Sequence, residues 1–209
     1  MCLKSQWFEK QERMEKERGD TSRMKLVCIG DVMLGRWVNE VLKHVPAEYP
    51  WGDTLPLFQE ADISICNLEC VLADRGQSWS RTPKVFHFRT DEKNMAVLKT
   101  AGIDLVSLAN NHVLDYEYEA MFRMMKVFTD NTIPFAGIGA NLWEASQPVR
   151  CRIHEQTIGL LAFTDNEPAW QATEKTPGVF YVPIDLEDPR ATYLFERIEK
   201  TVVGLLRMI

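Results

Sequence analysis

The feature that most constrains this chain is a pattern that occurs three times, in which a short apolar run ends in polar side chains. The three segments, in chain order, are KLVCIGD (25–31), ADISICNLE (61–69) and IDLVSLANNH (103–112). Short apolar runs that end at glycine, asparagine or aspartate are typical of buried β-strands followed by a turn. Helical spacing between the runs predicts a strand–helix–strand order. We therefore expect an α/β fold whose early part is a largely parallel sheet.

The remaining segments extend this order toward the C-terminus. Apolar residues at helical spacing predict four helices, at 38–44, 91–102, 116–131 and 190–209. The alternation in KVFHFR (84–89) predicts a further strand. Two apolar runs, 149–153 and 158–163, flank a polar HEQT and predict an antiparallel hairpin. Residues 164–178 are polar and contain proline, which predicts a loop.

The first 23 residues contain basic and acidic side chains mixed together and little apolar surface. We expect a solvated helix or a disordered leader there, followed by one domain over 24–209. An extended start is the alternative, because Met24 directly precedes the first strand. No stretch reaches the roughly 18 apolar residues of a membrane span, and the N-terminus lacks the apolar core of a signal peptide. The sequence therefore predicts a cytoplasmic protein with no membrane span.

The net charge limits the kinds of partner, and the cysteines limit the kinds of structural site. The formal net charge is −6, which argues against a nucleic-acid binder, since such a protein needs a basic face. Small anionic substrates remain open, because a bound metal supplies positive charge locally. The five cysteines form neither a disulfide framework nor a structural zinc pattern. Cys28 and Cys66 lie inside apolar runs and are expected in the core.

The polar strand ends are predicted to lie together. Ligand sites in open α/β sheets form outside the carboxyl ends of the strands, so parallel neighbours would bring three clusters to one edge. The clusters are Asp31; Asn67 and Glu69; and Asn110, Asn111, His112 and Asp115. Carboxylate, amide and imidazole groups suit divalent manganese, magnesium, zinc or iron. Each motif also has a purely structural interpretation, since Asn-His pairs form turns and an aspartate can cap the next helix.

Four segments together resemble one protein family. IGDVMLGR, ADISICNLECVL, AGIDLVSLANNHVLD and FAGIGANLWEA are similar to successive signatures of the CapA-type poly-γ-glutamate (capsule) synthesis proteins, over about residues 25–185. That family resembles calcineurin-like metallophosphoesterases. The resemblance therefore implies a metallophosphatase-like αββα sandwich with a dinuclear metal site. It also implies metal-assisted hydrolysis or transfer on an anionic small-molecule or polymer substrate. The implied partner is a capsule or polyglutamate synthesis complex, which would bring peripheral membrane association.

The resemblance assigns metal ligands by position. Asp31 corresponds to the first-site ligand, Glu69 to the bridging carboxylate, and Asn111 to the amide ligand of the second metal. Manganese, iron, zinc and magnesium all remain open as the bound ions.

The resemblance also assigns catalytic and substrate-side residues. His112 corresponds to the catalytic histidine that stabilises or protonates the reacting group. Asp115 would either orient His112 or cap the following helix. Asn67 would support the bridging carboxylate on the substrate side. Arg36 would either clamp an anionic substrate or lie at the surface as an ordinary arginine.

One departure from the family pattern puts activity in doubt. The family continues with histidine motifs resembling HWG and GHHPH, and the histidines of this chain stand in no such context: His44, His87, His112 and His154. We therefore expect an incomplete sandwich in which the C-terminal strands and histidine motifs are missing. Fewer ligands predict weak metal binding and weak or absent phosphoesterase turnover. The alternative function is a truncated, catalytically silent member that acts as a binding or scaffold protein.

Overall fold

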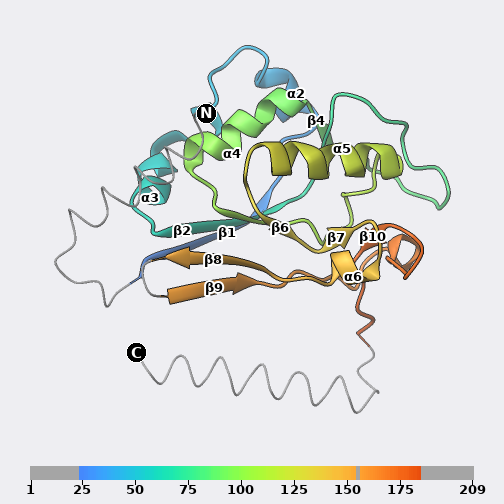
Figure 1. The fold of residues 1–209 in the computed structure, drawn as a ribbon. Helices are drawn as coiled ribbons and strands as arrows, with labels where there is room; N and C mark the ends of the chain where they lie inside the picture. Colours follow the sequence, from blue (N-terminus) through green and yellow to red (C-terminus); the bar gives the residue numbers. More distant parts are fainter. Residues whose placement is uncertain (1–23, 154–155, 185–209) are drawn as a thin grey trace.

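A four-stranded parallel sheet forms the centre of the molecule in the computed structural model, which describes residues 24–153 and 156–184 (Figure 1). In order across the sheet, its strands are β1 (Leu26–Val32), β2 (Ile63–Leu68), β5 (Leu105–Ser107) and β6 (Phe135–Ala136). Every neighbouring pair is parallel, which confirms the predicted α/β class. The predictions for the leader 1–23 and for a helix over 190–209 lie outside the described residues.

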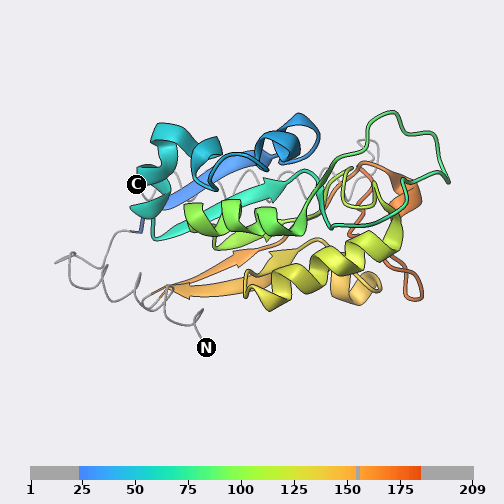
Figure 2. The ribbon, with the colours of Figure 1, turned by 90° about the horizontal axis from the view of Figure 1, so that it is seen from above.

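The helices that connect these strands cover one face of the sheet (Figures 1 and 2). They are α2 (Trp37–Val41), η1 (Tyr49–Thr54), α3 (Leu55–Gln59), η2 (Glu92–Asn94), α4 (Met95–Ala101) and α5 (Glu117–Asp130). The strands are added in one direction across the sheet, and right-handed crossovers in one direction place their helices on the same face. Helices α4 and α5 confirm the predicted positions, whereas α2 is shorter than expected. Within the described part of the chain, no helix has the length and apolar character that crossing a bilayer requires.

A β-hairpin covers the opposite face; the sequence predicts the hairpin, although its second strand begins two residues earlier than expected. Its antiparallel strands lie below the sheet in Figure 1 and are β8 (Val149–Ile153) and β9 (Gln156–Leu160). Ile63 and Leu105 of the sheet are buried against Ile153 of the hairpin. Because successive strand residues point to opposite faces, Cys66 and Val106 enter the core on the helix side instead. The described residues thus form three layers, helix–sheet–hairpin, and the second helix layer of an αββα sandwich stays a prediction.

Short pairs of strands close the end of the molecule at which the parallel strands finish. They are β3 (Val71–Leu72) with β4 (Arg89–Thr90), and β7 (Ile138–Gly139) with β10 (Gly178–Val179). The helices nearby are α6 (Leu142–Ala145) and η3 (Pro168–Trp170). The predicted loop 164–178 contains η3, and its Trp170 is fully buried. This segment is therefore packed into the fold despite its polar composition.

The alternation in 84–89 predicts a strand, and that prediction is wrong for most of the segment. Only Arg89–Thr90 forms a strand, and 84–88 belong to an irregular connection between β3 and β4. The backbone N–H of Phe88 donates to Asp115 Oδ2 at 2.6 Å, and the Lys84 side chain is buried. Contacts with the turn that contains Asp115 therefore replace the strand pairing that alternation predicts.

The cysteine predictions have different outcomes. Cys66 is buried, and burial raises the pKa of its thiol to about 12, so the thiol stays protonated at neutral pH. Cys28 is exposed, which contradicts its expected place in the core. The reason is its position in β1, an edge strand of the sheet.

Candidate metal centre

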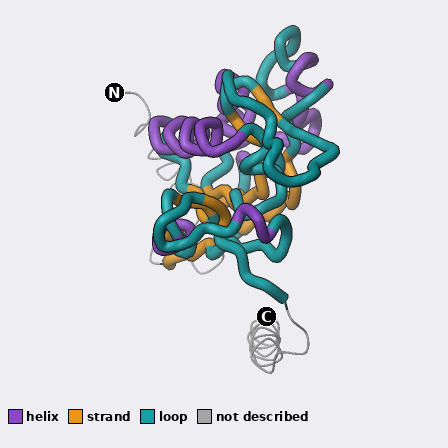
Figure 3. The backbone as a smooth tube through the Cα atoms, turned by 90° about the vertical axis from the view of Figure 1, so that its right-hand side faces the viewer, coloured by secondary structure: helices purple, strands orange, loops and turns teal. Residues whose placement is uncertain are grey.

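The predicted site residues lie at one end of the molecule, where the parallel strands finish. Loops cover this end, which faces the viewer in Figure 3. Asp31 and Asn67 are paired across β1 and β2, and Glu69 follows β2 directly. Asn111 and His112 follow β5 in a turn. The structure therefore brings the three polar strand ends together, as parallel pairing predicts.

A bulge in β1 turns Asp31 toward this cluster. Cys28 pairs with Ile65, and Asp31 pairs with Asn67. Between these two pairs, β1 contains one more residue than β2. Gly30 lies inside the bulge with φ 66°, a left-handed value that glycine adopts without a steric cost. Because a shift of one residue moves a side chain to the other face of a strand, the bulge decides on which side Asp31 lies.

Three amide contacts connect the strand ends. Asn67 Nδ2 donates to Asp31 Oδ1 at 2.8 Å, and Asn110 Nδ2 donates to Asn67 Oδ1 at 2.9 Å. The backbone N–H of His112 donates to Asn110 Oδ1 at 2.9 Å. Asn110 is 7% exposed, so it is a buried link between β2 and the turn after β5. Sequence reasoning placed Asn110 in the cluster without a role, because either asparagine of the NN pair could turn inward.

The imidazole of His112 is held on one edge and on one face. His112 Nδ1 donates to Asp115 Oδ2 at 2.6 Å, and both side chains are buried. The ring of Phe88 stacks on the imidazole with centroids 4.0 Å apart and planes 19° apart. Because Nδ1 is the donor, Nε2 is the nitrogen left to interact with the cluster, 3.9 Å from Glu69 Oε1. Asp115 therefore contacts His112, whereas the N-cap of α5 is Tyr116.

Glu69 and Asp31 form an electrostatically unfavourable pair. The pKa of Glu69 lies above its ordinary value because burial disfavours its charge and because the Asp31 carboxylate is close; His112 partly offsets this. A divalent cation between the two carboxylates would remove their repulsion. Two carboxylates and the amide oxygen of Asn111 therefore fit such an ion in chemistry, and the Nε2 of His112 lies beside them.

The arrangement of these ligands is nevertheless incomplete. Among residues 24–153 and 156–184, no three His, Cys, Asp or Glu side chains come close enough together to hold a metal ion. An ion held by Asp31 and Glu69 would therefore find no third ligand of these four residue types. It would also take further oxygen ligands from Asn111 or water.

We expect Glu69→Gln to change stability and metal affinity in opposite directions. Without metal, the substitution removes the repulsion of Asp31, so the melting temperature at pH 7 should rise slightly. A raised carboxyl pKa stabilises the fold below the ordinary pKa and loses that contribution as pH rises through the folded value. The melting temperatures should therefore converge at acidic pH. The affinity for Mn²⁺ should fall roughly 10- to 100-fold, as expected for the loss of a metal-site partner.

Calorimetric titration with Mn²⁺ and thermal melting from pH 4 to pH 8 would check both effects. Glu60→Gln is the matched control, because Glu60 is exposed and pairs with Lys25 at 2.8 Å on the surface. The control should leave Mn²⁺ affinity unchanged. An unchanged affinity in Glu69→Gln would remove Glu69 from the metal site.

Arg36 lies near two aromatic rings next to the cluster and has no carboxylate partner among the described residues. Its Cζ is 5.7 Å from the ring centroid of Phe86 and 5.9 Å from that of Phe88. Phe88 in turn stacks on His112. Arg36 also has φ 54°, unusual for a residue with a side chain. An exposed guanidinium is thus held over the aromatic wall of the site, where an anionic group could pair with it.

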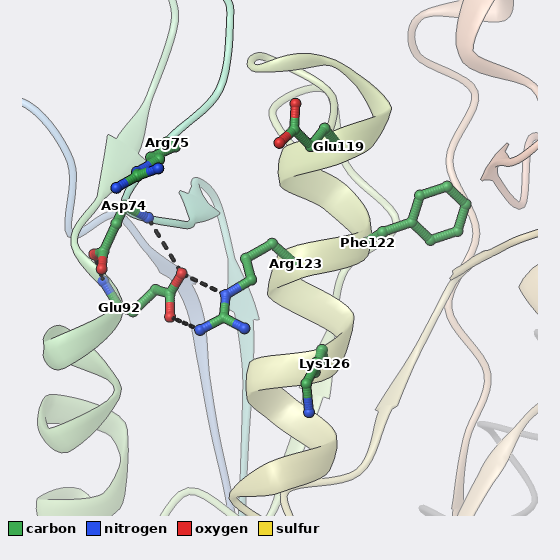
Figure 4. A pocket seen from close by; sticks show the side chains of 7 residues that line it. All are labelled: Asp74, Arg75, Glu92, Glu119, Phe122, Arg123 and Lys126. Atoms are coloured by element: carbon green, nitrogen blue, oxygen red, sulfur yellow. Dashed lines mark hydrogen bonds and ion pairs between the residues drawn. The ribbon is translucent and has the colours of Figure 1, made fainter.

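A pocket of about 510 Å³ lies away from this cluster, between α5 and the segments before α4 (Figure 4). Its lining residues are Asp74, Arg75, Glu92, Glu119, Phe122, Arg123 and Lys126. Arg123 binds Glu92 with two nitrogens, and this lowers the pKa of Glu92. The pocket contains none of the predicted site residues. Its Arg123 and Glu92 pair with each other, so these two charges are already compensated. It is therefore a weaker candidate than the strand-end cluster.

Comparison with known proteins connects the chain to one family. The model described as "Bacterial capsule synthesis protein PGA_cap" matches residues 25–202. The "Capsule biosynthesis protein CapA" of Bacillus anthracis is 25% identical over 181 residues, covering 85% of this chain and 44% of that protein. The "PGA biosynthesis protein CapA" of Bacillus subtilis (strain 168) is 28% identical over 161 residues, covering 76% and 42%.

A third relative belongs to another organism. The "Probable polyglutamine synthesis accessory protein" of Mycobacterium tuberculosis (strain ATCC 25618 / H37Rv) is 25% identical over 202 residues, covering 78% of this chain and 53% of that protein. The chain thus spans about half the length of the curated relatives it matches.

Proposed function

Because the chain belongs to the PGA_cap family of bacterial capsule synthesis proteins, we propose that it acts in the synthesis of a capsule polymer of the polyglutamate type through a metal-dependent site. The family supports the biological setting, since its relatives are named for capsule, PGA and polyglutamine synthesis. The observation that supports the chemistry is the meeting of Asp31, Glu69 and His112 at one sheet edge. The proposed reaction is hydrolysis or transfer at a phosphate ester or a related anionic group.

In this proposal, Asp31, Glu69 and Asn111 would hold a divalent cation, Mn²⁺, Fe²⁺, Zn²⁺ or Mg²⁺, in a site that would be dinuclear when complete. A bound ion of this kind lowers the pKa of a bound water and neutralises the negative charge of the substrate. Water would complete the set of ligands, because the described side chains provide few of them.

The protein's own residues then position and protonate the substrate. In its doubly protonated form, His112 would donate the proton of Nε2 to the leaving oxygen, while Asp115 keeps the proton of Nδ1 in place; the ring would then be the neutral Nδ1–H form. Arg36 pairs with the anionic group of the substrate from the aromatic side, and Asn67 holds Asp31 in orientation. Such a site suits an anionic small molecule or polymer, in association with a capsule or polyglutamate synthesis complex.

The proposal predicts metal-dependent turnover by the full 209-residue chain. With Mn²⁺, Zn²⁺ or Fe²⁺ added, the chain should hydrolyse an aryl phosphate monoester or diester slowly, because the described side chains provide few ligands. Asp31→Asn and His112→Gln should each lower kcat/KM by about 100-fold or more, the scale of a lost general acid or metal ligand. Chelator-treated protein should be inactive and should recover when the metal is returned.

Glu40→Gln serves as the control for the loss of a carboxylate, because Glu40 pairs with Lys43 on the exposed surface of α2. Its turnover should match the unsubstituted protein. Turnover that survives both Asp31→Asn and His112→Gln would place the chemistry elsewhere. If the chain neither binds Mn²⁺ nor hydrolyses the esters, the metal-site proposal fails. A binding or scaffold role, which the incomplete ligand arrangement favours, would then be preferred.

A further inference from the structure

The loop 75–88 contains a buried cation that the proposed site does not use. Residues 75–90 include four basic side chains and no acidic one, in a chain whose net charge is −6. The side chain of one of them, Lys84, is only 7% exposed. A buried ammonium is strongly destabilising unless charged and polar partners surround it. An apolar residue would fill the same space without needing partners, so the partners of Lys84 indicate what the charge does.

Lys84 joins two segments that are distant in sequence. Its Nζ donates to the backbone oxygen of Asn111 at 2.7 Å and to Glu167 Oε1 at 3.0 Å. The same nitrogen lies 3.5 Å from Asp115 Oδ1 and 4.8 Å from the ring centroid of Trp170. One ammonium thus contacts both ends of the turn that contains His112 and also the segment around η3.

The Asp115 carboxylate depends on this ammonium for one of its two oxygens. Oδ2 accepts hydrogen bonds from His112 Nδ1 and from the backbone N–H of Phe88, each at 2.6 Å. Oδ1 is buried and has no hydrogen-bond partner among the described residues, so Lys84 is the charge that compensates it. The ammonium faces one oxygen while His112 and the Phe88 N–H face the other, so Lys84 helps to fix the plane of the carboxylate against which His112 Nδ1 is held.

The segment on the other side of Lys84 is held in an unusual conformation. Glu167 has φ 55° and ψ 65°, the left-handed region that side chains rarely adopt. Its carboxylate accepts from Lys84, and its backbone oxygen accepts from Trp170 N–H at 2.8 Å. Trp170 is fully buried and packs edge-on against Trp79, with ring centroids 5.4 Å apart. The Lys84 contact therefore connects a strained turn to the histidine turn.

We propose that Lys84 is a positioning residue that locks the segment around Glu167 to the turn 111–115 and so keeps His112 Nε2 directed at the metal cluster. Lys84 itself does not touch substrate, since Trp170 and Glu167 enclose its ammonium. The catalytic value of this role rests on the proposed function, because it assumes that His112 reacts. The role of Lys84 in orienting His112 does not rest on the proposed function, because the tautomer and orientation of His112 can be measured without substrate.

The test compares Lys84→Met with the unsubstituted full chain by NMR of protein with ¹⁵N-labelled histidine, the His112 signals being assigned by their loss in His112→Gln. In the unsubstituted protein, His112 should be protonated at Nδ1, with a slowly exchanging, downfield-shifted proton. Lys84→Met keeps the length of the side chain but removes its charge. We expect it to lose that proton signal and to show a mixture of tautomers. Lys84→Arg should restore at least part of the signal, since it returns the charge.

A kinetic measurement separates positioning from substrate contact. Where the ester hydrolysis assay gives turnover, Lys84→Met should lower kcat roughly 10- to 100-fold, as outer partners of a metal site do, with KM changed less than about twofold. Lys126→Met is the matched control, because Lys126 pairs with Asp130 on the exposed side of α5. The control should change neither the His112 signals nor kcat.

Several results would overturn the proposal. An unchanged His112 tautomer and proton signal in Lys84→Met would reduce Lys84 to a purely structural cation. A large rise in KM with kcat unchanged would mean direct contact with substrate. If Lys84→Met does not fold, Glu167→Gln removes one charged partner from a side chain that is 26% exposed, and unchanged His112 signals there would contradict the lock. If the unsubstituted chain shows no turnover, the proposed function fails while the NMR comparison still decides the role of Lys84.

Discussion

Asp115→Asn should lower the free energy of unfolding by about 2–4 kcal/mol, although the two side chains have nearly the same shape. Asp115 is fully buried, and its carboxylate interacts with His112, with the backbone of Phe88 and with Lys84. An amide in its place removes a buried negative charge and directs an NH₂ group at a donor. Lys84 keeps Glu167 as a partner, which limits the loss. Urea unfolding of the two proteins would measure the difference.

The same substitution should reduce any ester hydrolysis by about 10²–10⁴-fold, since it weakens the hold on the histidine that transfers the proton. Asp130→Asn is the matched control, because Asp130 is exposed and forms an i,i+4 ion pair with Lys126. Exposed pairs of this kind contribute less than about 0.5 kcal/mol. Equal losses of stability in the two variants would show that the buried contacts of Asp115 have no special importance.

Gly137→Ala should be strongly destabilising, with an expected loss of roughly 2–5 kcal/mol. Gly137 joins β6 to β7 with φ 101°, a conformation that residues with side chains rarely adopt. A Cβ there would lie 2.5 Å from Ala109 Cβ and 2.8 Å from Ala109 N. Because Ala109 directly precedes Asn110, any relief of this clash would also displace the asparagine that connects β2 to His112.

Two other glycines separate the steric effect from the backbone effect. Gly30 has φ 66°, but no atom lies within 4 Å of the position that a Cβ would take, so Gly30→Ala should cost only the backbone term, about 1 kcal/mol. Gly159 has an ordinary φ, and the nearest atom to its Cβ position is Val149 O at 4.0 Å, so Gly159→Ala should be close to neutral. Thermal melting should rank the losses as Gly137, then Gly30, then Gly159. A different order would mean that the close approach to Ala109 is not what requires glycine.

The local pattern of the chain was sufficient to predict the central architecture. The runs that became β1, β2 and β5 end in polar residues, and parallel pairing then requires Asp31, Asn67 and His112 to lie at one edge. Helix α5 was predictable for a similar reason, because its buried side chains repeat at helical spacing. These features depend on residues that are close together in the sequence, or on a rule that applies to every parallel sheet.

The irregular connections could not be predicted in the same way. The alternation in 84–89 shows that polar and apolar side chains follow one another. It does not show which groups will form hydrogen bonds with the backbone of this segment. Phe88 bonds Asp115 instead of a strand, and Glu167 adopts a left-handed conformation inside a segment whose composition suggests only a loop. The basic residues of 75–90, with no acidic residue among them, were the one signal in the sequence that could have directed attention to Lys84.

The sequence by itself determined the α/β class, the order of the strands and the polar groups that gather at their carboxyl ends. Only the tertiary structure decided how those groups are oriented. The bulge at Gly30 sets the side on which Asp31 lies, and Phe88 and Asp115 hold the ring of His112. Lys84 connects positions separated by 27 and 83 residues. Such contacts depend on the burial of specific charges in three dimensions, and no local periodicity couples residues across these separations.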